Sequence, residues 1–189
     1  MNELFLIKQA INGDVESFEQ LISPYTKQLL NYIFRMLKNR EDAEDALQDT
    51  YIKVYNSLKS FQGNSSFRTW LYKVATNVCL DHLRKQKNTA NVSLNQTTPD
   101  GEYEFQISDD TYSPEVSAKR KAAFNALNTA MNKLEEDQRQ AVSLRDIHGL
   151  SYDEIAQVTD TTIGTVKSRI NRARQALRKF LEKDRELFQ

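Results

Sequence analysis

Residues 149–180 have the sequence GLSYDEIAQVTDTTIGTVKSRINRARQALRKF, and they establish much of the architecture. Gly149 suits the left-handed position after a helix, so it ends a helix predicted over residues 138–148. Ser151 and Glu154 have the spacing of a capping box, in which each side chain satisfies the other's backbone donor. The short helix that they begin ends near Asp160, because Asp tolerates a left-handed turn. A second helix follows at once, and the pair predicts a helix-turn-helix.

The second helix of this pair is strongly basic. Thr161 or Thr162 caps it, and its buried side carries Ile163, Val166, Ile170, Ala173, Leu177 and Leu181. Six cations and no acid occur over residues 163–180: Lys167, Arg169, Arg172, Arg174, Arg178 and Lys179. A merely solvated basic face is the alternative, but the absence of acids favours a helix that enters the major groove of DNA.

Residues on the outward face of the basic helix can contact bases and phosphates. Arg and Lys pair with guanine edges, while Ser and Thr bond to phosphates or bases. The residues that carry these groups are Thr165, Lys167, Ser168, Arg169, Asn171, Arg172 and Arg174.

Upstream, periodic apolar residues predict a helix over residues 41–58, with Asn39 as its N-cap. The core stripe of this helix is Ala43, Ala46, Leu47, Thr50, Tyr51, Val54, Tyr55 and Leu58. The opposite face is acidic but has Ile52 at its centre. Solvation and a favourable helix dipole would explain the acids alone. Ile52 among them favours a protein partner with a basic surface.

The next helix begins after Ser66, which can cap it, and combines aromatic with basic residues. Its predicted buried stripe is Phe67, Trp70, Leu71, Val74, Ala75 and Val78. Its other side carries Thr69, Lys73, Thr76, Asn77, Leu80 and Arg84, followed by Lys85 and Lys87. Basic groups next to aromatic rings suit a splayed single strand of nucleic acid. An ordinary amphipathic helix with core aromatics is the alternative.

The formal net charge of the 189 residues is zero, but the charges are segregated. Residues 88–117 contain six acids and no Lys or Arg, and they are rich in Asn, Thr and Ser. We predict that they form a flexible acidic linker. The expected fold is therefore all-α, with two small helical domains: an N-terminal bundle over residues 1–87 and the helix-turn-helix domain over residues 118–189.

Composition excludes several other classes of protein. A single cysteine, Cys79, allows no internal disulfide and suits a reducing cytoplasm. No apolar run reaches the roughly 20 residues of a membrane span, and residues 1–13 lack the pattern of a signal peptide. We therefore expect a soluble, cytoplasmic protein.

These motifs together resemble the sigma-70 superfamily, in particular its extracytoplasmic-function branch. Residues 42–55 resemble the helix that binds RNA polymerase in that family. Residues 61–77 resemble the loop and helix that open and read the −10 promoter element, and residues 149–169 resemble the domain that reads the −35 element. Leu134-Glu135 departs from the Leu-Pro that the family often has before the second helix of this domain.

The resemblance implies three groups of site residues. Those expected to bind the clamp of core RNA polymerase are Glu41, Asp45, Gln48, Asp49 and Ile52. Those expected to bind −10 DNA are Phe61, Gly63, Asn64, Ser65, Phe67, Arg68, Trp70, Lys73, Asn77, Arg84 and Lys85. Those expected to bind −35 DNA are Thr162, Thr165, Lys167, Ser168, Arg169, Asn171, Arg172 and Arg174.

The resemblance also implies partners: the clamp and flap regions of bacterial core RNA polymerase, promoter DNA, and an anti-sigma factor that could hold the protein at the membrane. A helix-turn-helix regulator that binds operator DNA without polymerase is the main alternative. We expect no catalytic residues, metal site, cofactor or small-molecule substrate, because the sequence has no metal-ligand spacing or phosphate-binding glycine loop. His82 and His148 are isolated, and Cys79 suits a small apolar role.

Overall fold

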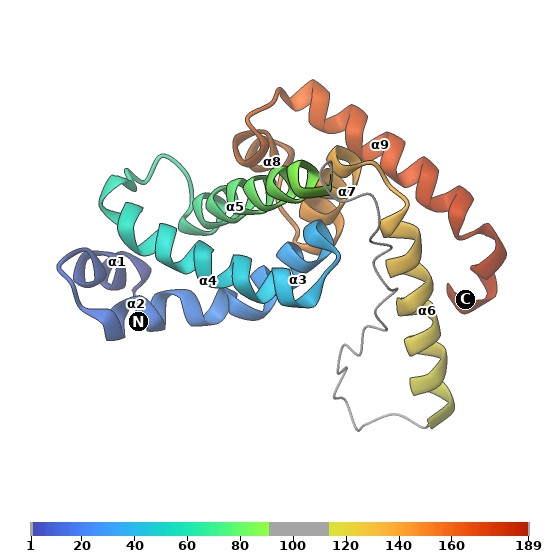
Figure 1. The fold of residues 1–189 in the computed structure, drawn as a ribbon, viewed down its shortest axis with the longest axis horizontal. Helices are drawn as coiled ribbons and strands as arrows, with labels where there is room; N and C mark the ends of the chain where they lie inside the picture. Colours follow the sequence, from blue (N-terminus) through green and yellow to red (C-terminus); the bar gives the residue numbers. More distant parts are fainter. Residues whose placement is uncertain (1, 91–113, 189) are drawn as a thin grey trace.

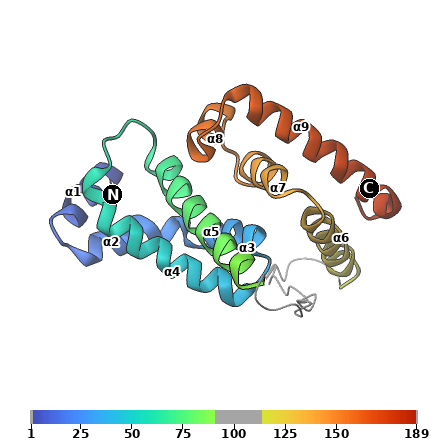
Figure 2. The same cartoon turned by 45° about the horizontal axis from the view of Figure 1, so that its top comes forward.

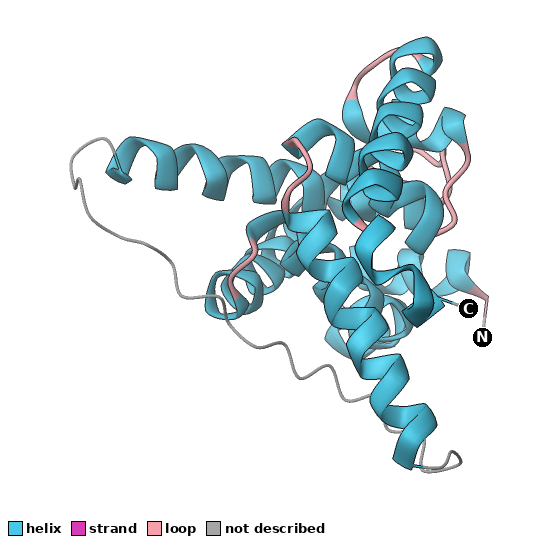
Figure 3. Ribbon diagram, turned by 90° about the vertical axis from the view of Figure 1, so that its right-hand side faces the viewer, coloured by secondary structure: helices cyan, strands magenta, loops and turns pink. Residues whose placement is uncertain are grey.

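The computed structural model describes residues 2–90 and 114–188, and within these ranges it is helical with no strand (Figures 1 and 3). The first lobe comprises α1 (Glu3–Ile11), α2 (Val15–Ile22), α3 (Thr26–Leu37), α4 (Arg40–Ser57) and α5 (Phe67–Ala90). The second lobe comprises α6 (Pro114–Asn132), α7 (Glu136–Val142), α8 (Tyr152–Thr159) and α9 (Ile163–Phe180). Short 3-10 turns cover Ser23–Tyr25, Leu58–Ser60 and Glu182–Phe188. The predicted all-α fold with two helical units is confirmed.

The predicted linker overlaps both lobes at its ends. Helix α5 continues to Ala90, and α6 already begins at Pro114. The remainder of the predicted linker, residues 91–113, lies outside the described residues. Among the described residues, no helix is long and apolar enough to cross a membrane.

Helix α3 supplies the centre of the first lobe. Leu29, Tyr32, Ile33 and Met36 are completely or almost completely buried on one side of it, where α4 and α5 pack against α3. Burial of a side chain of this size contributes about 1.5–3 kcal/mol, so each of these four residues stabilises the lobe substantially. The helix ends at Lys38, which adopts a left-handed conformation with φ of 63°.

Helix α4 lies within one residue of its predicted bounds at each end and has the predicted cap. The Asn39 side chain accepts a hydrogen bond from the Asp42 backbone N–H at 3.1 Å. The core stripe is confirmed except for Tyr55, which is 38% exposed and packs edge-on against Phe18 at the margin of the lobe.

Helix α5 is capped by Ser66, whose hydroxyl accepts from the Thr69 backbone N–H at 3.1 Å. Two threonines that the periodicity placed on its outward side are buried, so that prediction is wrong for them. Thr76 pairs with the Tyr32 hydroxyl at 2.6 Å inside the first lobe. Thr69 is covered by the second lobe and donates to Glu154 at 2.8 Å.

The helix-turn-helix is confirmed, with α8 and α9 as its two helices (Figure 2). The Ser151 and Glu154 capping box is complete, and Asp160 ends α8 in a left-handed conformation with φ of 48°. Thr162, the second of the two predicted candidates, caps α9 by accepting from the Thr165 N–H at 3.2 Å. Ile163 was expected on the buried side of α9 but is 40% exposed, because it lies at the first position beyond the cap.

The helix that precedes this pair has an unpredicted distortion. It begins as α7 and continues through Ser143–Ile147 as a π-helical turn, in which the His148 N–H donates to the Ser143 carbonyl at 3.0 Å. Such a turn accommodates an extra residue within a helix. It brings His148 into the interior of the protein, and Gly149 then ends the helix at φ of 70°.

The two lobes pack against each other through α5 with α8 and α3 with α7. One apolar cluster runs through both, from Leu29 and Leu71 in the first lobe to Leu144 and Ile155 in the second. Arg139 is buried at this contact and donates to the carbonyl oxygens of Leu134 at 3.0 Å and Met36 at 3.4 Å.

Candidate nucleic-acid interface

The acidic face of α4 is exposed as predicted. Glu41, Asp45, Gln48 and Asp49 are all exposed, and Ile52 among them is 59% exposed. An apolar side chain at that exposure within an acidic face is suited to burial by a partner whose surface carries both apolar and basic groups.

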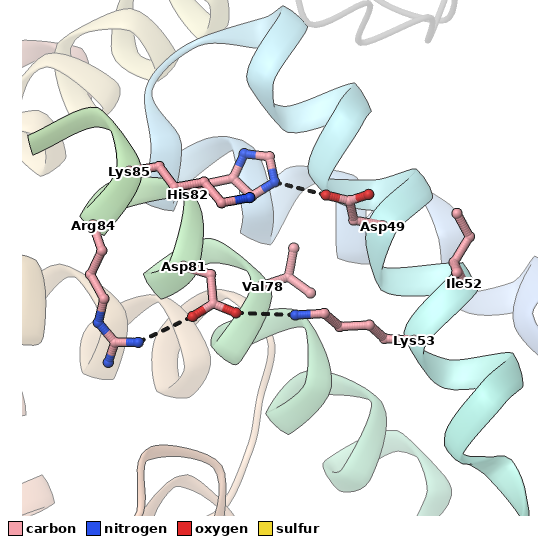
Figure 4. A pocket seen from close by; sticks show the side chains of 8 residues that line it. All are labelled: Asp49, Ile52, Lys53, Val78, Asp81, His82, Arg84 and Lys85. Carbon is pink, nitrogen blue, oxygen red and sulfur yellow. Dashed lines mark hydrogen bonds and ion pairs between the residues drawn. The ribbon is translucent and has the colours of Figure 1, made fainter. Parts of the chain in front are cut away.

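A pocket of about 420 Å³ adjoins this face, between α4 and α5 (Figure 4). Asp49 pairs with His82 Nε2 at 3.0 Å, and Lys53 pairs with Asp81 at 3.1 Å across the two helices. The hydrogen bond from Lys53 lowers the pKa of the Asp81 carboxyl, and nearby Arg84 adds to this effect.

The pocket joins residues that the sequence assigned to different partners. Asp49 and Ile52 were predicted to bind polymerase, and Arg84 and Lys85 were predicted to bind DNA. Sequence reasoning did not identify the other lining residues, which are Lys53, Val78, Asp81 and His82. The spacing of three or four residues puts Lys53 on one face of α4 and the other three residues on one face of α5. Nothing in the sequence shows that these two faces lie next to each other.

The loop between α4 and α5 rests on an aromatic cluster. The Phe61 ring lies 5.9 Å from the Phe67 ring and 5.4 Å from the Trp70 ring, centroid to centroid. Gly63 has φ of 72°, a conformation that favours glycine, and Asn64 beside it is exposed. The loop therefore presents polar groups above an aromatic floor.

Phe67 itself belongs to the core. It is 1% exposed, so in this structure it offers no surface to DNA, and its role is to support Phe61 and Trp70. Phe61, Ser65 and Trp70 are half-buried, which leaves part of each accessible.

The outward face of α5 is divided between solvent and the second lobe. Asn77, Arg84 and Lys85 are exposed. Arg68 donates to the backbone carbonyl of His148, and Lys73 pairs with Asp160 at 2.6 Å. Of the cations predicted to bind −10 DNA, two therefore contact the second lobe, and Lys73 does so at the turn of the helix-turn-helix.

The outer face of α9 carries most of the predicted −35 residues. Lys167, Ser168, Asn171 and Arg172 are exposed, and Thr165 is half-exposed beside the capping residue Thr162. Within the described ranges neither Lys167 nor Arg172 forms an ion pair, so both side chains are available to a ligand.

Two cations of α9 are compensated by acids of neighbouring elements. Arg169 pairs with Asp137, and Arg174 is held by Asp146 in two hydrogen bonds of 3.0 and 2.5 Å. The hydrogen bonds that Arg174 donates to the Asp146 carboxylate raise the pKa of Arg174. The sequence contains no acid within α9, but folding brings these two carboxylates to it from α7 and the π-helical turn. Both arginines thus connect α9 to α7 and to the π-helical turn that continues it.

The isolated titratable residues do not form a further site. Cys79 is buried, which raises the pKa of its thiol to about 12. His82 pairs with Asp49, and His148 forms a 2.9 Å hydrogen bond with the Tyr72 hydroxyl. In the described part of the chain no group of three or more His, Cys, Asp or Glu side chains could hold a metal ion.

Comparison with known proteins shows the family to which the chain belongs. Residues 21–89 match the family model for sigma-70 region 2, and residues 124–177 match the model for sigma-70 region 4. The chain is 35% identical over 186 residues to the RNA polymerase sigma-H factor of Pseudomonas aeruginosa, which covers 94% of this chain and 92% of the relative. It is also 35% identical to the extracytoplasmic-function sigma factor SigW of Bacillus subtilis, over 93% and 94% of the two chains.

A solved structure shares the fold across both lobes. The sigma factor RpoE of Bartonella quintana, in complex with the anti-sigma factor NepR, superposes with a TM-score of 0.71 at 26% identity, over 88% of this chain and 98% of that one. CnrH, in complex with the cytosolic domain of CnrY, has the same fold, with a TM-score of 0.68 at 23% identity over 95% of this chain and 97% of that one. Because relatives above 30% identity align along nearly its whole length, the chain belongs to the extracytoplasmic-function branch of the sigma-70 family.

Proposed function

We propose that this protein binds bacterial core RNA polymerase and directs it to promoters, by reading the −35 element as duplex and the −10 element as an opened strand. The observation that carries the proposal is the exposed basic face of α9, presented by a fully capped helix-turn-helix. A sigma factor is an initiation subunit, so the chemistry of RNA synthesis belongs to the polymerase. We accordingly assign polymerase binding and −10 recognition to the lobe that ends with α5, and −35 recognition to the lobe that begins with α6.

In the −35 step, α9 enters the major groove with its N-terminal half against the bases. Lys167 and Arg172 have no ion pair in the described structure, so DNA gains their full charge without displacing a carboxylate. Ser168 and Asn171 lie between them on the same exposed face and can donate to base edges or phosphates. Arg169 and Arg174 would have to leave Asp137 and Asp146 first, so we assign them to the support of α9 and, secondarily, to phosphates.

Alanine at Lys167 and Arg172 tests this assignment, with Arg178→Ala as a matched control near the far end of the same helix. Each lost base contact should weaken −35-dependent initiation by about 1–3 kcal/mol. The control should reduce initiation much less and equally at all promoters. Equal losses for all three variants, independent of the −35 sequence, would contradict the assignment.

In the −10 step, the loop from Phe61 to Ser65 would receive a base that has left the stack. Base extrusion costs a few kcal/mol, which the aromatic floor and the neighbouring cations must offset. Asn77, Arg84 and Lys85 are exposed along α5 and can follow the strand away from the loop.

The acidic face of α4 is our proposed contact with the polymerase clamp. Ile52→Ser and Asp45→Ala should each weaken core binding at every promoter alike, because neither residue faces DNA in this scheme. Lys59→Ala, an exposed residue in the turn after α4, is the control. Core affinity can be measured by fluorescence anisotropy, and unchanged affinity of both variants would refute the contact.

The partner that restrains the protein is proposed by analogy. The structure of RpoE was determined with the anti-sigma factor NepR, which supports an anti-sigma partner for this chain. Such a partner could hold the protein at the membrane, while its action on DNA would take place in the cytoplasm.

Reconstitution with core polymerase tests the function as a whole. Transcript 5′ ends from a genomic library should define promoters that share −35 and −10 sequences. A gel shift with and without core polymerase separates the main proposal from an autonomous helix-turn-helix regulator. Tight, specific binding by the protein alone, with no polymerase-dependent initiation, would favour the regulator.

A further inference from the structure

Two arginines of α9 lie at the edges of its outward face. Val166, Ile170 and Ala173 form the buried stripe of this helix. At about 100° per residue, Arg169 and Arg174 lie on opposite sides of that stripe, each about 70° from its centre. The arc between the two arginines, on the side away from the stripe, carries the exposed residues Lys167, Ser168, Asn171 and Arg172.

The edges of a helix in the major groove lie nearest to the phosphates. A helix with its side chains is about 10–12 Å wide, and the groove is about 12 Å wide, so each edge of the helix meets one wall. Contacts with phosphates fix the position of a protein on DNA but carry no direct sequence information. Free cations at positions 169 and 174 would therefore add attraction for DNA of any sequence.

Both edge arginines already have a carboxylate partner. Arg169 pairs with Asp137, and Arg174 donates two hydrogen bonds to Asp146, at 3.0 and 2.5 Å. A contact with two hydrogen bonds fixes the orientation of a guanidinium group as well as neutralising it. Among the described residues, Lys167 and Arg172 on the outward arc form no ion pair. Neutralised cations thus lie at the edges, and available ones lie between them.

The π-helical turn helps both acids to reach α9. Asp137 and Asp146 are nine residues apart, so a regular α-helix would place them about half a turn apart, on opposite faces. A π-helical turn takes up an extra residue, which removes up to about 100° from that angle. The turn at Ser143–Ile147 therefore brings Asp146 round towards α9, which packs along α7 (Figure 2). Turns of this kind occur frequently at functional sites.

We propose that Asp137 and Asp146 are built-in counterions that limit the attraction of α9 for DNA of any sequence, so that more of its affinity depends on the base-facing residues. The inference rests on the proposed function, since it assumes that α9 enters the major groove. The two acids touch no DNA in this scheme, so they are positioning residues that act through Arg169 and Arg174. The strength of an exposed ion pair corresponds to at most about a fivefold factor, so each acid should weaken DNA binding by about two- to fivefold.

Asp137→Asn and Asp146→Asn test the inference in the full chain, without polymerase. Each variant should bind a random-sequence duplex and a duplex with a −35 sequence mapped by the reconstitution above more tightly by the same factor, about two- to fivefold. The slope of the logarithm of affinity against the logarithm of salt concentration should also steepen by about 0.9 for each arginine released. Fluorescence anisotropy of labelled duplexes measures both quantities.

Two further variants separate a released cation from other effects. Glu186→Gln makes the same change in net charge at an exposed position after the end of α9, and it should match the unsubstituted protein. Adding Arg174→Gln to Asp146→Asn restores the neutrality of the pair without restoring the contact. That double variant should return to the affinity and the salt slope of the unsubstituted protein, whereas a loosened α9 would leave it different.

Unchanged salt slopes in both aspartate variants would overturn the inference. So would an equal steepening in Glu186→Gln, or weaker duplex binding by the aspartate variants. If the slopes are unchanged while the same preparations start transcription with core polymerase in a −35-dependent manner, the inference fails and the proposed function stands. Failure of initiation by the unsubstituted protein would remove the proposed function itself.

Discussion

His148 should make the stability of this protein depend on pH in a range where few other groups titrate. It is 5% exposed between the lobes, and burial lowers its pKa from 6.5 to about 4, with nearby Arg35 and Arg68 adding to the effect. The unfolded chain therefore binds a proton more readily than the folded one. The contribution of neutral His148 is fully present above about pH 6.5 and is lost as the pH falls towards about 4.

The size of this effect follows from the two pKa values. Between about pH 7 and about pH 5, preferential protonation of the unfolded chain removes about 2 kcal/mol of stability. That loss is a large fraction of the total for a chain of this size. The assay is urea unfolding followed by circular dichroism at several pH values across this range.

His148→Gln provides the comparison, because Gln cannot titrate but can still bond to the Tyr72 hydroxyl. Carboxylates that titrate near the acid end, such as that of Glu154, affect both proteins alike. The difference in unfolding free energy between the two proteins should change by about 2 kcal/mol over the range. Parallel pH profiles for the two proteins would refute the reasoning.

Three further expectations concern local structure. Ser151→Ala removes the cap of α8 and should cost about 1 kcal/mol, measured as a lower urea midpoint; an unchanged midpoint would show that the capping box is dispensable. Gly149→Ala forces a side chain into a left-handed conformation and should destabilise by about 1–2 kcal/mol. Gly164→Ala, where the added methyl group meets only Thr162 at 3.8 Å, should be neutral or slightly stabilising, and equal losses for the two glycines would contradict the backbone argument. Cys79 is buried with its pKa raised to about 12, so a thiol reagent should label it far more slowly in the native protein than in urea, and equal rates would disprove its burial.

Local signals in the sequence predicted local features correctly. Asn39, Ser66, Ser151 and Asp160 each act through backbone groups within a few residues of themselves, so their roles follow from spacing alone. The helix-turn-helix and the exposed acidic face of α4 follow from the same periodic patterns.

Features that depend on distant segments were missed or wrong. The burial of Thr69 requires Glu154 from the other lobe, and the pairing of Arg169 requires Asp137 from another helix. Ile163 fits the apolar period of α9, but at the first position after the cap it is 40% exposed. A single sequence contains no information on which faces meet, so the candidate surfaces were predicted but their mutual occlusion was not.

The buried guanidinium of Arg139 implies that temperature affects the arrangement of the lobes. Its bonds are to carbonyl oxygens, and its Nε has no hydrogen-bond partner in the part of the chain that the structure describes. Keeping such a cation from water costs less as the temperature rises, because the hydration of charged groups becomes less favourable. The apolar part of the contact also weakens on cooling. Both effects have the same sign, so cold should favour separated lobes and warmth should favour closed ones.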